Sequence, residues 1–259
     1  MKTEYPIILV HGVMLKDWKF IKSFGNIKKV LNNAGFCVET SKTDGFGTIE
    51  NNAKQLKKQI EEILIKYNTD KVNIIAHSKG GLDSKFLIKE LGMEKHIASL
   101  TTLCTPHKGS KIADKLLSLP KWYVKILEFW INLIYKIFKD ENPNCLEVAK
   151  QLKSIDTIEE ETQNFSDIVY CQSYSTTLKR SRDDFIMGIP LVFSKKYEKD
   201  KSDGMVSNKS AVFADYKGDC LEESVSHSEI VGFSLSKKKR KRIEEFYIKL
   251  CEELKKMGF

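Results

Sequence analysis

One short stretch, "NIIAHSKGGLDS" at residues 73–84, constrains the fold more than any other part of the sequence. It begins as the end of an apolar strand, and after a polar turn two glycines lead into a helical pattern. The small residues Ala76 and Gly80, two positions before and two after Ser78, would let strand and helix approach closely. The stretch therefore predicts a buried strand that turns sharply into a helix, with a serine at the bend.

Short apolar runs alternate with helix-length segments along most of the chain. Runs rich in β-branched residues predict strands, and the amphipathic segments between them predict helices. Gly35 and Gly92 follow two of these segments, where a left-handed residue commonly ends a helix. The alternation predicts an α/β fold with a mostly parallel central sheet and helices on both faces. The expected strands are 5–10, 36–41, 71–76, 97–105 and 167–175, and the expected helices are 15–35, 48–67 and 81–92.

The 259 residues fit a single domain, 1–259, but residues 111–165 contain no clear strand. Within them, the apolar stretch 121–140 is interrupted by charged residues and is short for a bilayer span. We interpret 111–165 as a helical insertion that forms a mobile lid; an aromatic core helix is the alternative. Closed, such a lid would bury its apolar face over Ser78. The side chains expected to contact substrate are Trp122, Leu127, Trp130 and Ile134.

The formal net charge of +8 is partly concentrated in "KKKRKR" at 237–242. Such a run could bind nucleic acid or an anionic membrane, or could be the solvated start of the last helix. No nucleic-acid-binding module accompanies it, so we favour the solvated helix and expect no nucleic-acid partner.

The six cysteines contain no CxxC pair and no tight spacing, which argues against a zinc site or a disulfide framework. Reduced cysteines and the lack of a recognisable signal peptide favour a cytoplasmic location, and secretion would require a leader that has been removed.

Ser78 would lie at the amino end of a helix, where the dipole and free N–H groups stabilise negative charge. That is the setting of a serine nucleophile in a strand–turn–helix motif. The alternative is an ordinary turn in which the serine only caps the helix.

Further segments favour the catalytic interpretation. "ILVHG" at 8–12 ends an early strand, so the amide of Val13 could pair with that of Lys79 to bind an oxyanion. His11 and Gly12 in the same turn are expected to contact substrate.

Late in the chain, "KSDGMVS" places Asp203 in a glycine-containing turn, and "SVSHSEIVG" places His227 before the final helix. The chain order serine, acid, histidine is that of the α/β-hydrolases. Asp200, Asp215 and Asp219 compete with Asp203 as the acid.

Five blocks, "PIILVHG", "KVNIIAHSKGG", "TPHKGS", "SDGMVS" and "HSEIV", occur in this order between residues 5 and 232. In order and approximate spacing they resemble the bacterial triacylglycerol lipases, which have the α/β-hydrolase fold. The resemblance implies that Ser78 is the nucleophile, His227 the base and Asp203 its orienting acid. It also implies that Val13 and Lys79 provide the oxyanion-binding amides.

The chain departs from this family at two places. Ala76 stands where the family motif usually has glycine. Many members bind calcium near the histidine loop, and Glu229 falls where a calcium-binding carboxylate would lie. Asp183 and Asp184 are out of register with the second carboxylate. We therefore expect no metal and no other cofactor.

The sequence thus predicts a monomeric serine carboxylic ester hydrolase, a lipase or esterase acting on acylglycerols or other lipid or small esters, with transient contact to a lipid surface. In such an enzyme the insertion 111–165 would bind the acyl chain of the substrate. An acyltransferase or thioesterase could use the same residues, because an alcohol can intercept an acyl-enzyme and a thiol can be its leaving group. A non-catalytic peripheral membrane-binding protein is the third hypothesis. It would not require Ser78, Asp203 and His227 together.

Overall fold

The computed structural model describes residues 3–13, 17, 22–154, 165, 167–184, 187–188, 192 and 200–259. Its centre is a six-stranded sheet in the order β2–β1–β3–β4–β5–β6, and every neighbouring pair is parallel. The five strands expected from the apolar runs are present, which confirms the α/β fold. The strands are β1 (Ile7–Val10), β2 (Val38–Thr40), β3 (Val72–His77), β4 (Ile97–Leu103), β5 (Tyr170–Ser175) and β6 (Asp215–Asp219).

Strand β6 has no counterpart in the sequence prediction. Its sequence "DYKGD" is polar, and it lies at the edge of the sheet beside β5. An edge strand needs only one partner and buries little side-chain area, so it carries no apolar signal. The apolar run "IPLVF" at 189–193, whose sequence is also strand-like, lies almost wholly outside the described residues.

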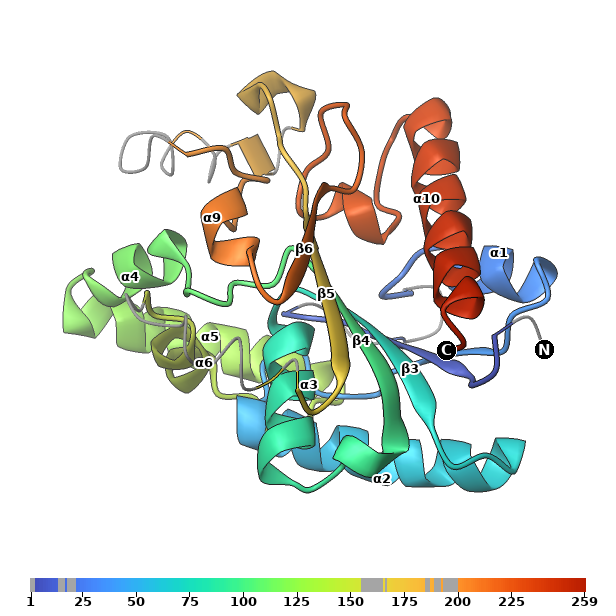
Figure 1. Cartoon of the computed structure of the whole chain (residues 1–259). Helices are drawn as coiled ribbons and strands as arrows, with labels where there is room; N and C mark the ends of the chain where they lie inside the picture. The colour runs from blue at the N-terminus through green and yellow to red at the C-terminus, as the bar shows by residue number, and fades with distance from the viewer. Residues whose placement is uncertain are drawn as a thin grey trace.

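Helices cover both faces of the sheet (Figure 1). On one face lie α1 (Ile27–Asn33) and α10 (Lys237–Lys256), and on the other lie α2 (Ile49–Tyr67) and α3 (Lys79–Glu90). Because side chains alternate along a strand, Ile7 and Leu9 pack in the core with α1 and α10. Ile8 and Val10 pack in the core with α2 and α3.

The predicted helix 15–35 is wrong in its extent, because among its described residues only Ile27–Asn33 are helical. Gly25 has φ +48°, which interrupts a right-handed helix, and a Cβ there would lie 3.3 Å from the carbonyl oxygen of Gly232. Close backbone packing therefore sets the start of α1. Gly35 and Gly92 do have the left-handed φ values, 89° and 65°, expected after a helix.

Helices α4 (Lys111–Leu117), α5 (Lys121–Ile137) and α6 (Cys145–Gln151) gather at one end of the molecule (Figure 1). The described part of segment 111–165 is thus largely helical. No described helix is both long and apolar enough to cross a membrane. Helix α5 nevertheless leaves large apolar side chains exposed: Trp122, Tyr123, Ile126, Phe129, Trp130, Leu133, Ile134 and Ile137.

The basic run 237–242 forms the first turns of α10, which confirms its interpretation as the start of the last helix. The hydroxyl of Ser236 caps this helix by accepting a hydrogen bond from the amide of Lys239. All six cysteines lie in the described part of the chain and are free thiols. The remaining short elements are α9 (Asn208–Ala211), η1 (Glu94–His96), η2 (Ser181–Asp183) and η3 (Glu229–Val231).

Candidate active site

Ser78 lies at the sharp turn from β3 into α3. Its backbone has φ 55° and ψ −132°, a conformation that L residues rarely adopt and that costs free energy. The amide of Ser78 donates to the carbonyl oxygen of Leu103 in β4, 2.9 Å away, which anchors the turn to the sheet. The strained turn projects a half-buried serine from the carboxyl end of β3.

Two glycines let neighbouring segments approach this turn. A Cβ at Gly12 would lie 2.6 Å from the Cβ of Ser78 and 3.0 Å from the amide nitrogen of Lys79. A Cβ at Gly80 would lie 2.5 Å from the carbonyl oxygen of His11. Any larger side chain would therefore force the end of β1 away from the serine.

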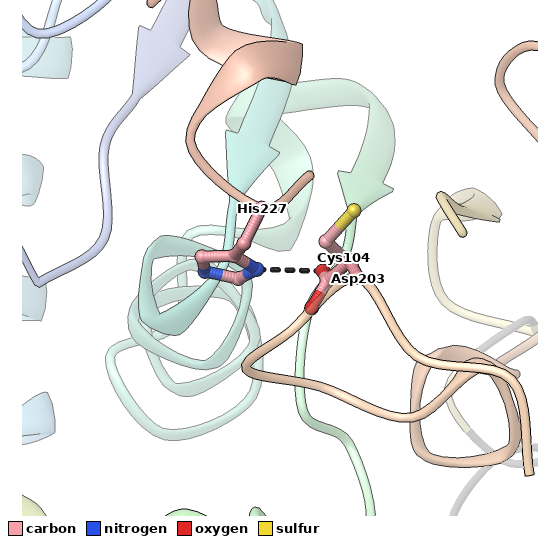
Figure 2. Close-up of side chains that lie close together, drawn as sticks. All are labelled: Cys104, Asp203 and His227. Atoms are coloured by element: carbon pink, nitrogen blue, oxygen red, sulfur yellow. Dashed lines mark hydrogen bonds and ion pairs between the residues drawn. The ribbon is translucent and has the colours of Figure 1, made fainter. Parts of the chain in front are cut away.

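His227 joins the serine to a carboxylate. Its Nε2 lies 2.9 Å from Oγ of Ser78. Its Nδ1 lies 2.6 Å from Oδ2 of Asp203 (Figure 2). The amide of His227 also donates to the carbonyl oxygen of Asp203 at 3.0 Å, so backbone contact fixes the two loops together. The structure thus brings together the three residues that the sequence placed in order along the chain.

The carboxylate of Asp203 is buried and oriented by its own turn. Its Oδ1 accepts hydrogen bonds from the amides of Met205 at 2.8 Å and Val206 at 2.7 Å, which leaves Oδ2 for His227. Two of the three competing carboxylates have other partners, and the third, Asp200, is exposed. Asp219 accepts from the hydroxyls of Ser175 and Thr177, and Asp215 is exposed and pairs with Lys217.

Cys104 beside this acid was not predicted from the sequence (Figure 2). Its Sγ, a carboxylate oxygen of Asp203 and a ring nitrogen of His227 all lie within 4.8 Å of one another, a spacing that could hold a metal ion. A metal would need a thiolate and a free imidazole nitrogen. Burial, reinforced by the charge of Asp203, raises the thiol pKa well above its usual value, and Nδ1 of His227 already contacts Asp203. These donors therefore suit the hydrogen-bonded pair better than a metal.

The other predicted site residues have different settings. His11 is fully buried and contacts the carbonyl oxygen of Gly12 through Nδ1 at 2.9 Å, so it supports the turn after β1 from inside. Val13 is half-buried at the end of the same turn. On α5, Trp122 is 66% exposed and Trp130 is 56% exposed. Ile134 is also exposed and Leu127 is half-buried, so the apolar face of α5 is not in the closed position expected for a lid.

A buried ion pair that begins at the residue after Ser78 was also not predicted from the sequence. Nζ of Lys79 lies 2.7 Å from Oδ1 of Asp83, and both side chains are 1% exposed or less. Nδ2 of Asn52 donates to the other carboxylate oxygen at 3.0 Å and to the carbonyl oxygen of Asp44 at 2.9 Å. Burial raises the pKa of Asp83 to about 6, although Lys79 and Asn52 act in the opposite direction. The spacing of four residues was the available signal, but it normally indicates an exposed pair.

Glu229, the carboxylate considered for calcium from the sequence, pairs with Lys239. Both carboxylate oxygens of Glu229 lie 2.8 Å from Nζ of Lys239, and the hydroxyl of Ser234 donates to Oε1 at 2.8 Å. Asp184 accepts from the hydroxyls of Ser226 and Ser228. A carboxylate already neutralised by an ammonium does not fit a calcium site, which needs several free oxygen ligands.

We expect removal of calcium to leave both kcat and Tm unchanged, because Lys239 supplies the positive charge beside Glu229. Hydrolysis rate and thermal unfolding, each measured with a chelator and then with added calcium, check this. Lys239→Ala should lower the free energy of unfolding by about 3 kcal/mol, since it leaves the carboxylate of Glu229 buried and unpaired. A chelator that reduced both activity and Tm, with recovery on adding calcium, would contradict the prediction.

The sheet order, the strained serine turn after β3 and the late acid and histidine loops are those of an α/β-hydrolase. A family model described as palmitoyl protein thioesterase matches residues 6–177, well over half of the chain. The chain therefore belongs to the palmitoyl protein thioesterase family.

Comparison with known proteins places the chain among the lipases. It is 27% identical to triacylglycerol lipase 2 of Saccharomyces cerevisiae, over 90% of this chain and 73% of that protein. It is 35% identical to a triacylglycerol lipase of Pseudarthrobacter phenanthrenivorans, over 43% of this chain but only 36% of that protein. The mature lipase of Bacillus licheniformis has a similar structure, with a TM-score of 0.63, 19% identity, and coverage of 89% and 88% of the two chains.

These relatives confirm a serine ester hydrolase of the lipase type with the α/β-hydrolase fold, as the resemblance implied.

Proposed function

We propose that this protein hydrolyses carboxylic esters of lipids through an acyl-enzyme formed on Ser78. The observation that carries the proposal is the continuous hydrogen-bonded path from Oγ of Ser78 through His227 to Asp203, at 2.9 and 2.6 Å. A serine hydroxyl is a weak nucleophile at neutral pH, and a base within hydrogen-bond distance activates it. Membrane binding alone would give no reason for this path.

In the first half-reaction, Oγ of Ser78 attacks the ester carbonyl carbon while Nε2 of His227 takes the hydroxyl proton. Asp203 keeps the remaining N–H of the ring on Nδ1 and stabilises the imidazolium that forms. The carbonyl oxygen becomes an oxyanion, which the amides of Lys79 and Val13 would bind. Gly12 supports this assignment because its missing side chain lets the end of β1 lie against Lys79.

The tetrahedral intermediate then collapses, and the ester C–O bond breaks as His227 returns its proton to the leaving alcohol. This leaves the acyl group on Oγ of Ser78. In the second half-reaction, His227 takes a proton from water, the resulting hydroxide attacks the acyl carbon, and the proton returns to Ser78. The products are a fatty acid and an alcohol, and the enzyme is regenerated.

Asp203→Asn should lower kcat by about 10⁴-fold, because an amide can leave the imidazole in the wrong tautomer. Asp215→Asn is the matched control, since Asp215 is exposed at the sheet edge, and it should leave kcat within about twofold. Steady-state kinetics on a soluble p-nitrophenyl ester measure both. A normal rate in Asp203→Asn together with a large loss in Asp215→Asn would overturn the assignment of the acid.

A thioesterase is the second candidate, favoured by the family model that matches residues 6–177. The same acyl-enzyme would form, and His227 would protonate a thiol in place of an alcohol. Matched oxygen esters and thioesters of one fatty acid, compared by kcat/KM, separate the two substrates. A competing alcohol in the same assay shows whether the acyl group is transferred instead of hydrolysed.

The exposed apolar face of α5 supports the proposal that segment 111–165 is a lid that opens at a lipid surface. Eight large apolar side chains in water carry a free-energy cost that transfer into lipid would remove. A lipid surface would select such an open arrangement over one in which α5 covers the serine. The substrate would then reach a monomeric enzyme at the interface.

The rate of hydrolysis should rise abruptly when substrate concentration passes the solubility limit. In Trp130→Ser this rise should be several-fold smaller, because the variant loses one large apolar contact with lipid, worth roughly 1.5–3 kcal/mol when fully transferred. Trp130 is 56% exposed, so its replacement should leave Tm little changed and the rate on dissolved substrate similar. Smooth saturation through the solubility limit in an active wild type would identify an esterase with a fixed α5.

A further inference from the structure

A cavity of about 220 Å³ lies between α3, the loop that follows β4 and the carboxyl end of α6. Ser78, Asp203 and His227 are not among its lining residues. Its walls combine apolar side chains, among them Leu82 and Phe86, with the charged side chains of Lys85, Lys89 and Lys153. Such a mixture suits a small ligand that has both an apolar part and an anionic group.

His107 gives this cavity an unmet hydrogen-bonding group. The imidazole is 2% exposed, stacks on Phe213 with a centroid distance of 4.3 Å, and contacts Oγ1 of Thr102 through Nε2 at 3.1 Å. Its Nδ1 is buried and has no partner among the described residues. Burial and the charge of Lys85 hold the pKa of His107 well below its usual value, so the ring is neutral. The hydroxyl of Thr102 can donate to Nε2, and in that arrangement the neutral ring carries its proton on Nδ1, which then needs an acceptor.

The charges around the cavity determine the kind of acceptor. Lys85 is 9% exposed, and its ammonium lies 4.2 Å from the ring centroid of Phe213, the ring on which His107 stacks. Lys89 and Lys153 are exposed, and among the described residues that line the cavity Glu90 is the one carboxylate. Three lysines against one carboxylate favour an anion.

We propose that this cavity binds the carboxylate of a short- or medium-chain fatty acid, with its chain against Leu82 and Phe86, and that its occupancy slows turnover. A fatty acid is the product of the proposed ester hydrolysis, and in that respect the inference rests on the proposed function. The carboxylate would accept a hydrogen bond from Nδ1 of His107 and lie beside the ammonium of Lys85. Both contacts are stronger with a charged acceptor than with an alcohol.

The loop after β4 connects the cavity to the catalytic acid. The hydroxyl of Ser110 donates to the carbonyl oxygen of Met205 at 2.9 Å, and the hydroxyl of Ser210 donates to the carbonyl oxygen of Gly109 at 2.6 Å. The amide of Met205 is one of the two that orient Asp203. A ligand that draws His107 toward the cavity would therefore disturb the turn that positions the acid. Inhibition should lower kcat and leave KM unchanged.

Calorimetric titration with octanoate tests the site directly, without relying on turnover. Wild-type protein should bind octanoate, and should bind it equally well after a serine-directed phosphonate has blocked Ser78. His107→Phe keeps the stacking on Phe213 and Lys85→Met keeps the aliphatic stem, and each should weaken binding about 10- to 100-fold. Lys153→Met at the rim, which leaves the buried groups intact, should weaken it less. Lys95→Met, an exposed lysine outside the cavity, should leave it unchanged.

The other outcomes have distinct meanings. Loss of octanoate binding on phosphonate treatment would place octanoate in the active site and overturn the proposal, as would purely competitive inhibition. Inorganic phosphate or octanol binding as tightly as octanoate would show that the carboxylate–chain combination is not what the cavity recognises. Octanoate binding by a protein that hydrolyses no ester would refute the proposed function and leave the cavity assignment intact. Ester hydrolysis without octanoate binding would overturn the cavity assignment and leave the proposed function intact.

Discussion

Ser78→Ala is expected to lower kcat for ester hydrolysis by about 10⁶-fold, because it removes the hydroxyl on which the acyl-enzyme forms. The fold should be unaffected. Alanine is smaller than serine, and it adopts the strained φ of 55° at this turn with similar difficulty. Hydrolysis of a p-nitrophenyl ester and thermal unfolding measure the two properties separately.

Ser84→Ala provides the matched control. Ser84 lies in α3, the helix that follows Ser78, and is buried, but its hydroxyl donates to the carbonyl oxygen of Gly80 and not to His227. Its replacement should change kcat by less than about tenfold. A serine-directed phosphonate should label wild type and Ser84→Ala once and leave Ser78→Ala unlabelled. Activity that survived in purified Ser78→Ala would refute the nucleophile assignment.

Asp83→Ala is expected to have the largest effect on stability, lowering the free energy of unfolding by about 3–5 kcal/mol. The substitution leaves the ammonium of Lys79 buried without its partner, directly beside the serine turn. The double variant Lys79→Met, Asp83→Asn removes both charges with almost no change in side-chain volume, so it should be destabilised less than Asp83→Ala. Chemical denaturation measures all three proteins.

An exposed pair of a lysine and a carboxylate is the control. Lys150 and Glu147 lie 3.0 Å apart with side chains 54% and 43% exposed, and Glu147→Ala should change stability by less than about 1 kcal/mol. If Asp83→Ala cost no more than Glu147→Ala, the pair near Ser78 would not be buried as described. If the double variant folded well but lost kcat, the pair would also position the amide of Lys79.

The pH dependence of stability follows from the direction of the Asp83 shift. Its folded-state pKa of about 6 lies above the ordinary value of 3.8, so between these pH values the folded state binds more protons than the unfolded state. The contribution of Asp83 to stability therefore falls as pH rises from about 4 to 6. The double variant lacks this contribution. The free energy of unfolding of wild type, relative to that of the double variant, should therefore decrease as pH rises from about 4 to 6.

Local patterns in the sequence determined most of the fold. Apolar runs with β-branched residues predict a strand wherever the side chains are buried on both faces, and β1, β3 and β4 are such strands. The role of the glycines around Ser78 could also be predicted from the sequence, because the close approach of β1 and α3 excludes larger residues. The order of Ser78, Asp203 and His227 along the chain was also visible, through motifs that each depend on only a few adjacent residues.

Only the tertiary structure decided the features that depend on partners far away in sequence. Ser78 and His227 are separated by 149 positions, and their contact exists because β3 and the loop after β6 end at the same edge of the sheet. β6 is a strand because its backbone pairs with that of β5 at the edge of the sheet. Lys239 occupies the place beside Glu229 because α10 begins next to the histidine loop. Burial makes Lys79 and Asp83 a strong pair, since the same spacing on an exposed helix contributes little. In each case the stabilising free energy depends on segments that are distant in the sequence, so a local sequence pattern cannot predict the contact.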